Sequence, residues 1–194
     1  TTVGANSLTA TSAGLTGSPV TFTATGTPGV ATKLAFATQP SASTVAGVAF
    51  ATQPVVTVQD ANGDTVTGST ASVTLTLTTG TGALGGPVTM NAIAGVADFS
   101  GKGLNINLVG VNKVLTATSG VLATATTSPA FTITAGTATT IAVNAGNAQS
   151  ATAGSAVATD PSVLVTDANG NPKSGVSVTF AGATGGGTVV PTSA

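Results

Sequence analysis

The residues of this chain best suited to chemistry lie in one short motif, Asp60-Ala61-Asn62-Gly63-Asp64. Oxygen-bearing side chains at alternate positions open the calcium-binding loop of an EF-hand. That loop also needs Gly at its sixth position and Glu at its twelfth, and here those positions are Thr65 and Ala71. A tight turn explains the same residues, because Asp bonds to its own loop and Asn-Gly accommodates positive φ. We therefore predict a turn and no metal, with Asp60, Asn62 and Asp64 as the candidate ligands if a metal binds.

This chain lacks several residue types on which enzymes usually rely for catalysis. There is no His, Cys, Tyr, Glu or Arg, so the usual general bases and oxyanion partners are absent. Asp60 and Asp64 share one turn, where nothing in the sequence would raise a carboxyl pKa. We predict no catalytic residue, no bound cofactor and no enzymatic activity.

Lysine beside Asn or Asp could form an intramolecular isopeptide bond if all the reacting groups were buried together. Lys33 stands at the edge of a predicted domain, and Lys102 and Lys113 lie beside predicted turns. We expect all three side chains to be solvated.

The charge balance and the hydropathy of the chain exclude two classes of partner, nucleic acids and the membrane interior. Lys and Arg total 4, Asp and Glu total 5, and the formal net charge is −1. A chain without a basic stripe cannot neutralise phosphates, so we expect no nucleic-acid binding. No apolar run approaches the roughly 20 residues of a membrane helix, so we expect no membrane insertion in this segment.

The elements that would position any site are strands. Threonine makes up about a fifth of the chain, and β-branched residues favour a pleated, half-buried surface. Apolar and polar residues alternate in segments 73–78, 104–108, 131–134 and 176–180. Alternation places one apolar face on a core, as in an antiparallel sheet. Many such strands between Gly-rich turns predict an all-β protein built from antiparallel β-sandwiches.

The sequence also repeats itself. Segment 54–63 recurs as 161–170, Leu8-Thr9-Ala10-Thr11-Ser12 recurs as 115–119, and 34–36 matches 141–143. The common offset is about 107 residues, which is the length of a whole domain. We call two positions at this offset equivalent. We predict the last strands of one module in residues 1–32, a complete module in 33–138 and the first half of another in 139–194.

The repeated segments resemble a known family. Residues 33–40, 46–50 and 54–63, followed by Gly95-Val96-Ala97-Asp98-Phe99, are similar to bacterial immunoglobulin-like modules of the invasin and intimin type. Segment 163–172, with 175–180, resembles them more closely still. The resemblance implies tandem immunoglobulin-like sandwiches of a protein that is extracellular or at the cell surface.

Three functions remain open on these grounds, and one of them, a spacer attached to a secreted hydrolase or a phage virion protein, would be revealed by flanking sequence. The first is a structural rod or filament, in which neighbouring polypeptide completes the partial modules at both ends. The partners would then be copies of the chain or adjacent modules, joined head to tail or laterally. The alternative is a spacer, stalk or binding module of a bacterial adhesin that recognises a glycan or a host surface.

Thr-x-Thr runs such as 74–78 suit half-buried strands, and they could equally carry O-linked sugar.

Overall fold

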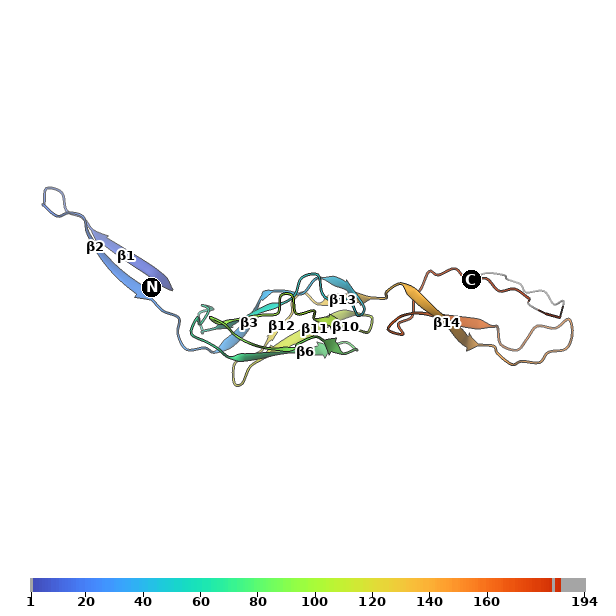
Figure 1. Cartoon of the computed structure of the whole chain (residues 1–194). Helices are drawn as coiled ribbons and strands as arrows, with labels where there is room; N and C mark the ends of the chain where they lie inside the picture. Colours follow the sequence, from blue (N-terminus) through green and yellow to red (C-terminus); the bar gives the residue numbers. More distant parts are fainter. Residues whose placement is uncertain (1, 183, 186–194) are drawn as a thin grey trace.

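The chain is all-β, as the alternating segments predict. The computed structural model describes residues 2–182 and 184–185 of the 194-residue chain. These residues form strands, turns and loops, and among them there is no helix and hence none that could cross a membrane. Three parts follow one another along an elongated molecule: an N-terminal hairpin, a central body and a C-terminal sheet (Figure 1).

The N-terminal hairpin pairs β1 (Gly4–Ala10) with β2 (Val20–Gly26) in antiparallel register. Leu8 lies opposite Phe22 and Ala10 opposite Val20. Because directly opposed residues share a face, these four side chains form one apolar face. The other face carries the hydroxyl-bearing residues of both strands.

The central body, residues 33–134, contains two sheets and resembles a β-sandwich. The first sheet has the order β3 (Lys33–Thr38), β5 (Val55–Gln59), β9 (Val96–Asp98). The second sheet has the order β4 (Ser43–Val45), β13 (Phe131–Thr134), β11 (Gly110–Thr118), β6 (Ser72–Thr79), β8 (Thr89–Asn91), with β12 (Ala125–Thr126) also beside β11. A short pair, β7 (Leu84–Gly85) and β10 (Asn105–Ile106), lies outside these two sheets. Every pairing of these strands is antiparallel except that of β4 with β13, which is parallel.

One hydrophobic core fills the space between these two sheets. It receives alternate residues of each strand, because successive side chains of a strand point to opposite faces. Phe131 packs edge-on against Phe50, with ring centroids 5.5 Å apart. The other large buried side chains are Leu34, Val56, Val58, Val73, Leu75, Phe99, Leu104, Ile106, Leu115 and Ile133. The threonines of β6 lie on the outer face, as the alternation predicts.

The C-terminal sheet is smaller, with β14 (Ala138–Ala145) antiparallel to β15 (Ser162–Asp167). The alternation in residues 176–180 predicts a strand there, and that prediction is wrong, since the structure shows only an isolated bridge position in this segment. A strand needs a neighbour to pair its backbone N–H and C=O groups. The segment has the residue pattern of a strand without a described strand beside it.

Candidate functional site

The candidate motif forms the loop that follows β5, and Asp60 organises it. Asp60 Oδ1 accepts the backbone N–H of Asn62 at 2.9 Å and of Asp64 at 3.0 Å. Gly63 N donates to Asp60 O at 3.2 Å, which closes a four-residue turn. Gly63 has φ +94°, whereas Asn62 does not have a positive φ. Glycine alone therefore supplies the left-handed conformation that we expected of the Asn-Gly pair.

The second oxygen of Asp60 reaches out of this loop. Asp60 Oδ2 accepts the backbone N–H of Gly29 at 2.8 Å, and Gly29 belongs to the connection between β2 and β3. The carboxylate is almost fully buried, and the loop thus fixes the end of the preceding connection. Asp60 is a structural acceptor with three backbone donors.

The three candidate metal ligands do not converge in this geometry. Asn62 and Asp64 contribute their backbone N–H groups to the loop, and the side chain of Asn62 is exposed. N–H donors surround the Asp60 carboxylate, whereas a hard cation needs several clustered oxygens. In residues 2–182 and 184–185, no three His, Cys, Asp or Glu side chains form a group that could hold a metal ion.

A second loop, after β15, repeats this geometry at the equivalent positions. Asp167 Oδ1 accepts the backbone N–H groups of Asn169 and Asn171, both at 2.9 Å. Asp167 Oδ2 accepts the N–H of Gly136 at 2.9 Å, and Gly136 lies between β13 and β14. The amide Nδ2 of Asn171, which replaces the carboxylate of Asp64, adds bonds at 3.1 and 3.0 Å to the two Asp167 oxygens.

The second loop also binds the central body directly. Asn171 Oδ1 accepts the N–H of Val109 at 3.0 Å, and Asn171 Nδ2 donates to Asn107 O at 2.9 Å. Asn169 Nδ2 donates to Ala46 O at 3.1 Å. Only 2% of the Asn171 surface is exposed, so this amide is a buried connector between two parts of the chain. We call these contacts, together with the Gly136–Asp167 bond, the joint.

A side chain at Gly47 would displace the Asn169 amide from its place in the joint. A Cβ built on Gly47 would lie 2.8 Å from Asn169 Nδ2, closer than carbon and nitrogen approach without a shift. Gly47 also has φ +75°, a conformation that L-residues rarely adopt. The close approach of Asn169 thus depends on glycine.

The two Asp carboxyl groups are held in their charged form. The N–H of Gly29 is the main cause that lowers the pKa of Asp60 from 3.8. Burial raises the pKa of Asp167, but the donors of Gly136 and Asn171 outweigh that effect and lower the pKa from 3.8 to about 2. Hydrogen bonds to the charged form favour that form. Both loops are therefore built for a carboxylate at neutral pH.

Lys113 corrects one expectation from the sequence. It is fully buried under the second sheet, whereas we expected a solvated side chain, and its ammonium donates to Thr81 O. Burial lowers the pKa of Lys113. The aliphatic stem packs beside Gly80 and Gly110. A Cβ on Gly80 would lie 2.9 Å from Lys113 Cγ, and a Cβ on Gly110 would lie 3.1 Å from Lys113 Nζ. The two glycines leave the room that this stem occupies.

Sequence reasoning identified the first loop and missed the joint. The partners Gly29 and Gly136 are each 31 residues before their Asp, so no local pattern joins them. A signal was present, because both glycines lie in the connections before a first strand and are themselves equivalent positions of the repeat. Comparison of the chain with protein-family models and with curated proteins finds no match.

Proposed function

We propose that the chain is a structural segment of an extracellular or cell-surface rod or filament built from tandem immunoglobulin-like modules. The joint is the observation that carries this proposal. A buried side-chain amide and a buried carboxylate fix the C-terminal sheet to the central body through backbone groups. A flexible linker would leave those groups to water, whereas a rod needs successive units in a fixed relation.

The strand order of the central body supports the immunoglobulin-like assignment. In an immunoglobulin sandwich, a sheet that contains strands A, B and E packs against a sheet that contains strands G, F and C. The first sheet, β3-β5-β9, and the central strands β13-β11-β6 of the second sheet follow that order along the chain. Together with the repeat in the sequence, this order supports the assignment of residues 33–138 to one module.

The partial units on either side fit the same scheme. The N-terminal hairpin, within residues 1–32, would be the end of a preceding module, and residues 139–194 would begin a following one. The equivalent bonds Gly29–Asp60 and Gly136–Asp167 would then fix two successive loops to the connections before them in the same way.

The composition favours a structural role outside the cell. The chain has no Cys that could be oxidised and few Lys or Arg residues for trypsin-like proteases. It also lacks the His, Cys, Glu, Tyr and Arg side chains on which many enzyme sites depend. These properties support a passive element of a surface structure.

Small-angle X-ray scattering of the 194-residue chain tests the rod. At a concentration low enough to keep both chains monomeric, we expect one narrow range of maximum dimensions for the parent chain and a broader range for the Asn171→Ala variant, which loses the joint's bonds to Val109 and Asn107. Asn62→Ala is the matched control, because Asn62 is the residue equivalent to Asn169 in the first loop and its side chain is exposed. A parent chain as variable in length as Asn171→Ala would overturn the proposal.

A further inference from the structure

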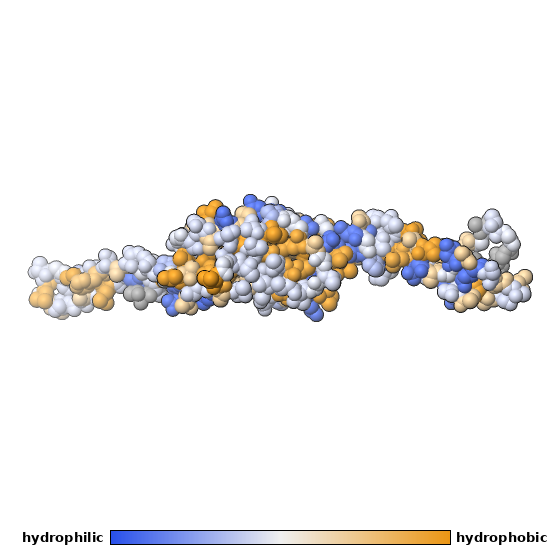
Figure 2. Space-filling model, turned by 90° about the horizontal axis from the view of Figure 1, so that it is seen from below, coloured by the Kyte–Doolittle hydropathy of each residue, from blue (hydrophilic) through white to orange (hydrophobic). Residues whose placement is uncertain are grey.

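Both ends of the molecule expose large apolar side chains on one face. In the N-terminal hairpin Leu8 is 68% exposed and Phe22 58% exposed. In the C-terminal sheet Ile141 is 56% exposed and Val143 64% exposed. Figure 2 shows hydrophobic surface over both ends of the molecule. Exposed apolar faces of this kind mark interaction surfaces.

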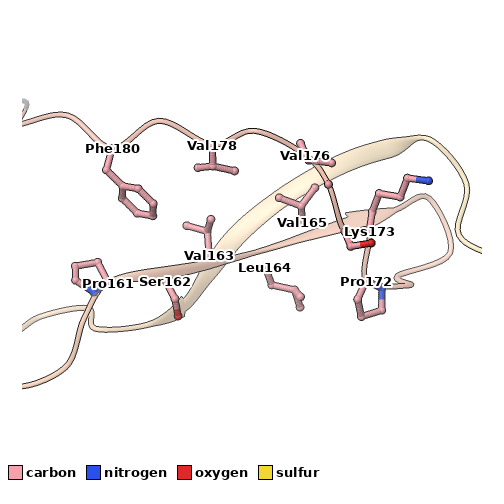
Figure 3. Close-up of a pocket in the computed structure, with 12 residues that line it drawn as sticks. Pro161, Ser162, Val163, Leu164, Val165, Pro172, Lys173, Val176, Val178 and Phe180 are labelled. Carbon is pink, nitrogen blue, oxygen red and sulfur yellow. The ribbon is translucent and has the colours of Figure 1, made fainter. Parts of the chain in front are cut away.

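The apolar face of the C-terminal sheet is regular. Ile141 lies opposite Val165 and Val143 opposite Val163, so the four side chains share one face. The segment 176–180 runs over this face, and the side chains of Val163 and Val165 point toward it (Figure 3). Two open hollows of about 400 and 410 Å³ remain beside that segment. Within residues 2–182 and 184–185, no facing sheet covers this face, unlike the equivalent face of the central body.

The central body shows what covers such a face. Leu34, Val56 and Val58 are equivalent to Ile141, Val163 and Val165, and all three are buried. Opposite them in the same core lie Leu115 and Ala117 of β11, both with no exposed surface.

Leu115 and Ala117 are in turn equivalent to Leu8 and Ala10 of the N-terminal hairpin. The hairpin therefore carries the residues that cover this face in the central body, and the C-terminal sheet carries the residues that are covered. The two ends of the chain thus carry complementary parts of one core, and the equivalents of buried Phe99, Leu104 and Ile106 lie in neither end.

We propose that the β1–β2 hairpin of one copy packs onto the C-terminal sheet of a second copy, head to tail. Leu8 and Phe22 enter the hollows beside Val163, Val165 and Phe180. This inference rests on the proposed function, because it treats both ends as parts of one kind of module. The opposite face of the hairpin, with Thr21 and Thr23, stays in solvent.

The test is the molar mass of the whole chain in solution, by light scattering over a range of concentrations. We expect multiples of the 18.1 kDa chain mass that grow with concentration. Phe22→Asp and Ile141→Asp each remove one side of the contact, so each variant alone is a monomer. An equimolar mixture of these two variants keeps one intact side from each and forms a particle of two chains that grows no further.

Matched controls place the same charge on the opposite faces. Thr23→Asp and Ala142→Asp are exposed neighbours that point away from the contact, and both assemble like the parent chain. A parent chain that stays monomeric, or controls that dissociate as fully as Phe22→Asp, overturns the pairing. Small-angle scattering of the monomeric variants separates this pairing from the proposed rod. If the monomer is extended, the rod proposal stands even when the pairing fails. If the monomer is folded back on itself, both proposals are wrong.

Discussion

At the scale of single residues, Asp60 and Asp167 act as acceptors that bind a distant backbone amide to a local turn. A carboxylate suits this task because its two oxygens can accept several N–H groups at once. One oxygen closes the loop, and the other binds glycine in the preceding connection. Glycine leaves room at that point, since a Cβ on Gly29 would come within 3.3 Å of Asp60 Oδ2.

The depressed pKa of Asp167 predicts an acid-sensitive joint. A carboxyl whose pKa is 3.8 when unfolded and about 2 when folded stabilises the fold fully above pH 3.8. That contribution is lost as the pH falls from 3.8 to about 2. We expect the amide proton shift of Gly136, followed by NMR, to titrate with a midpoint near 2 and to stop titrating in Asp167→Asn. Asp160→Asn, at an exposed position, is the control, and a Gly136 midpoint near 3.8 would contradict the assignment.

Buried Lys113 predicts a gain of stability on removal of its charge. Its pKa is lowered from 10.5 by burial, so the folded state disfavours the proton that the unfolded state keeps. Stability from this group therefore rises as the pH approaches 10.5. We expect Lys113→Met, which keeps the stem volume, to raise the melting temperature at pH 7 by a few degrees and by less at pH 10. Lys102→Met, at an exposed lysine, should change neither, and a lower melting temperature of Lys113→Met would refute this account.

At the scale of strands, alternation of side chains decides which surfaces become core. Val73 and Leu75 of β6 are buried in the core, whereas Thr74 and Thr76 form hydrogen bonds on the outer face. The same alternation in residues 176–180 did not produce a strand. A period of two specifies which face is apolar, but strand formation also requires a partner for the backbone.

The core and the hairpin should respond differently to the loss of one phenyl ring. Phe131 is buried against Phe50, so Phe131→Ala removes packed surface and leaves a cavity, at a cost of about 3–5 kcal/mol. Phe22 is 58% exposed, so Phe22→Ala should cost less than about 0.5 kcal/mol in a dilute monomer. Denaturant unfolding at low protein concentration measures both values, and equal costs would show that the hairpin is already packed.

The sequence was sufficient to predict strands at the positions of β6 and β13 and the turn at Asp60, because these depend on local pattern. It was not sufficient for Lys113, since adjacency to a turn does not reveal that Gly80 and Gly110 leave space beneath the sheet. It also missed the bonds of Asn171, which depend on backbone groups far away in the chain. Long-range contacts of single polar groups leave no periodic signal.

At the scale of the whole molecule, the joint predicts an asymmetry between two equivalent glycines. Gly47 and Gly154 occupy the same position in the repeat, and both have positive φ, so alanine strains the backbone at either position. Only at Gly47 would the new Cβ meet Asn169, because nothing lies within 4 Å of a Cβ at Gly154. We expect hydrogen exchange of the Asn169 side-chain amide, which donates to Ala46 O, to become faster in Gly47→Ala and to stay unchanged in Gly154→Ala. Equal effects of the two variants would argue against the joint.

The parallel pairing of β4 with β13 has a mechanical consequence. β4 lies near the start of the central body and β13 at its end, and Thr132 N–Ala42 O and Ala46 N–Thr134 O bonds connect them. Tension applied through the two ends of the module pulls these strands along their length in opposite directions. Such shear loads all bonds between them together, whereas a hairpin pulled open breaks its bonds one after another. In single-molecule stretching, the module should resist a higher force when pulled through residues 33 and 138 than when pulled across β6 and β11.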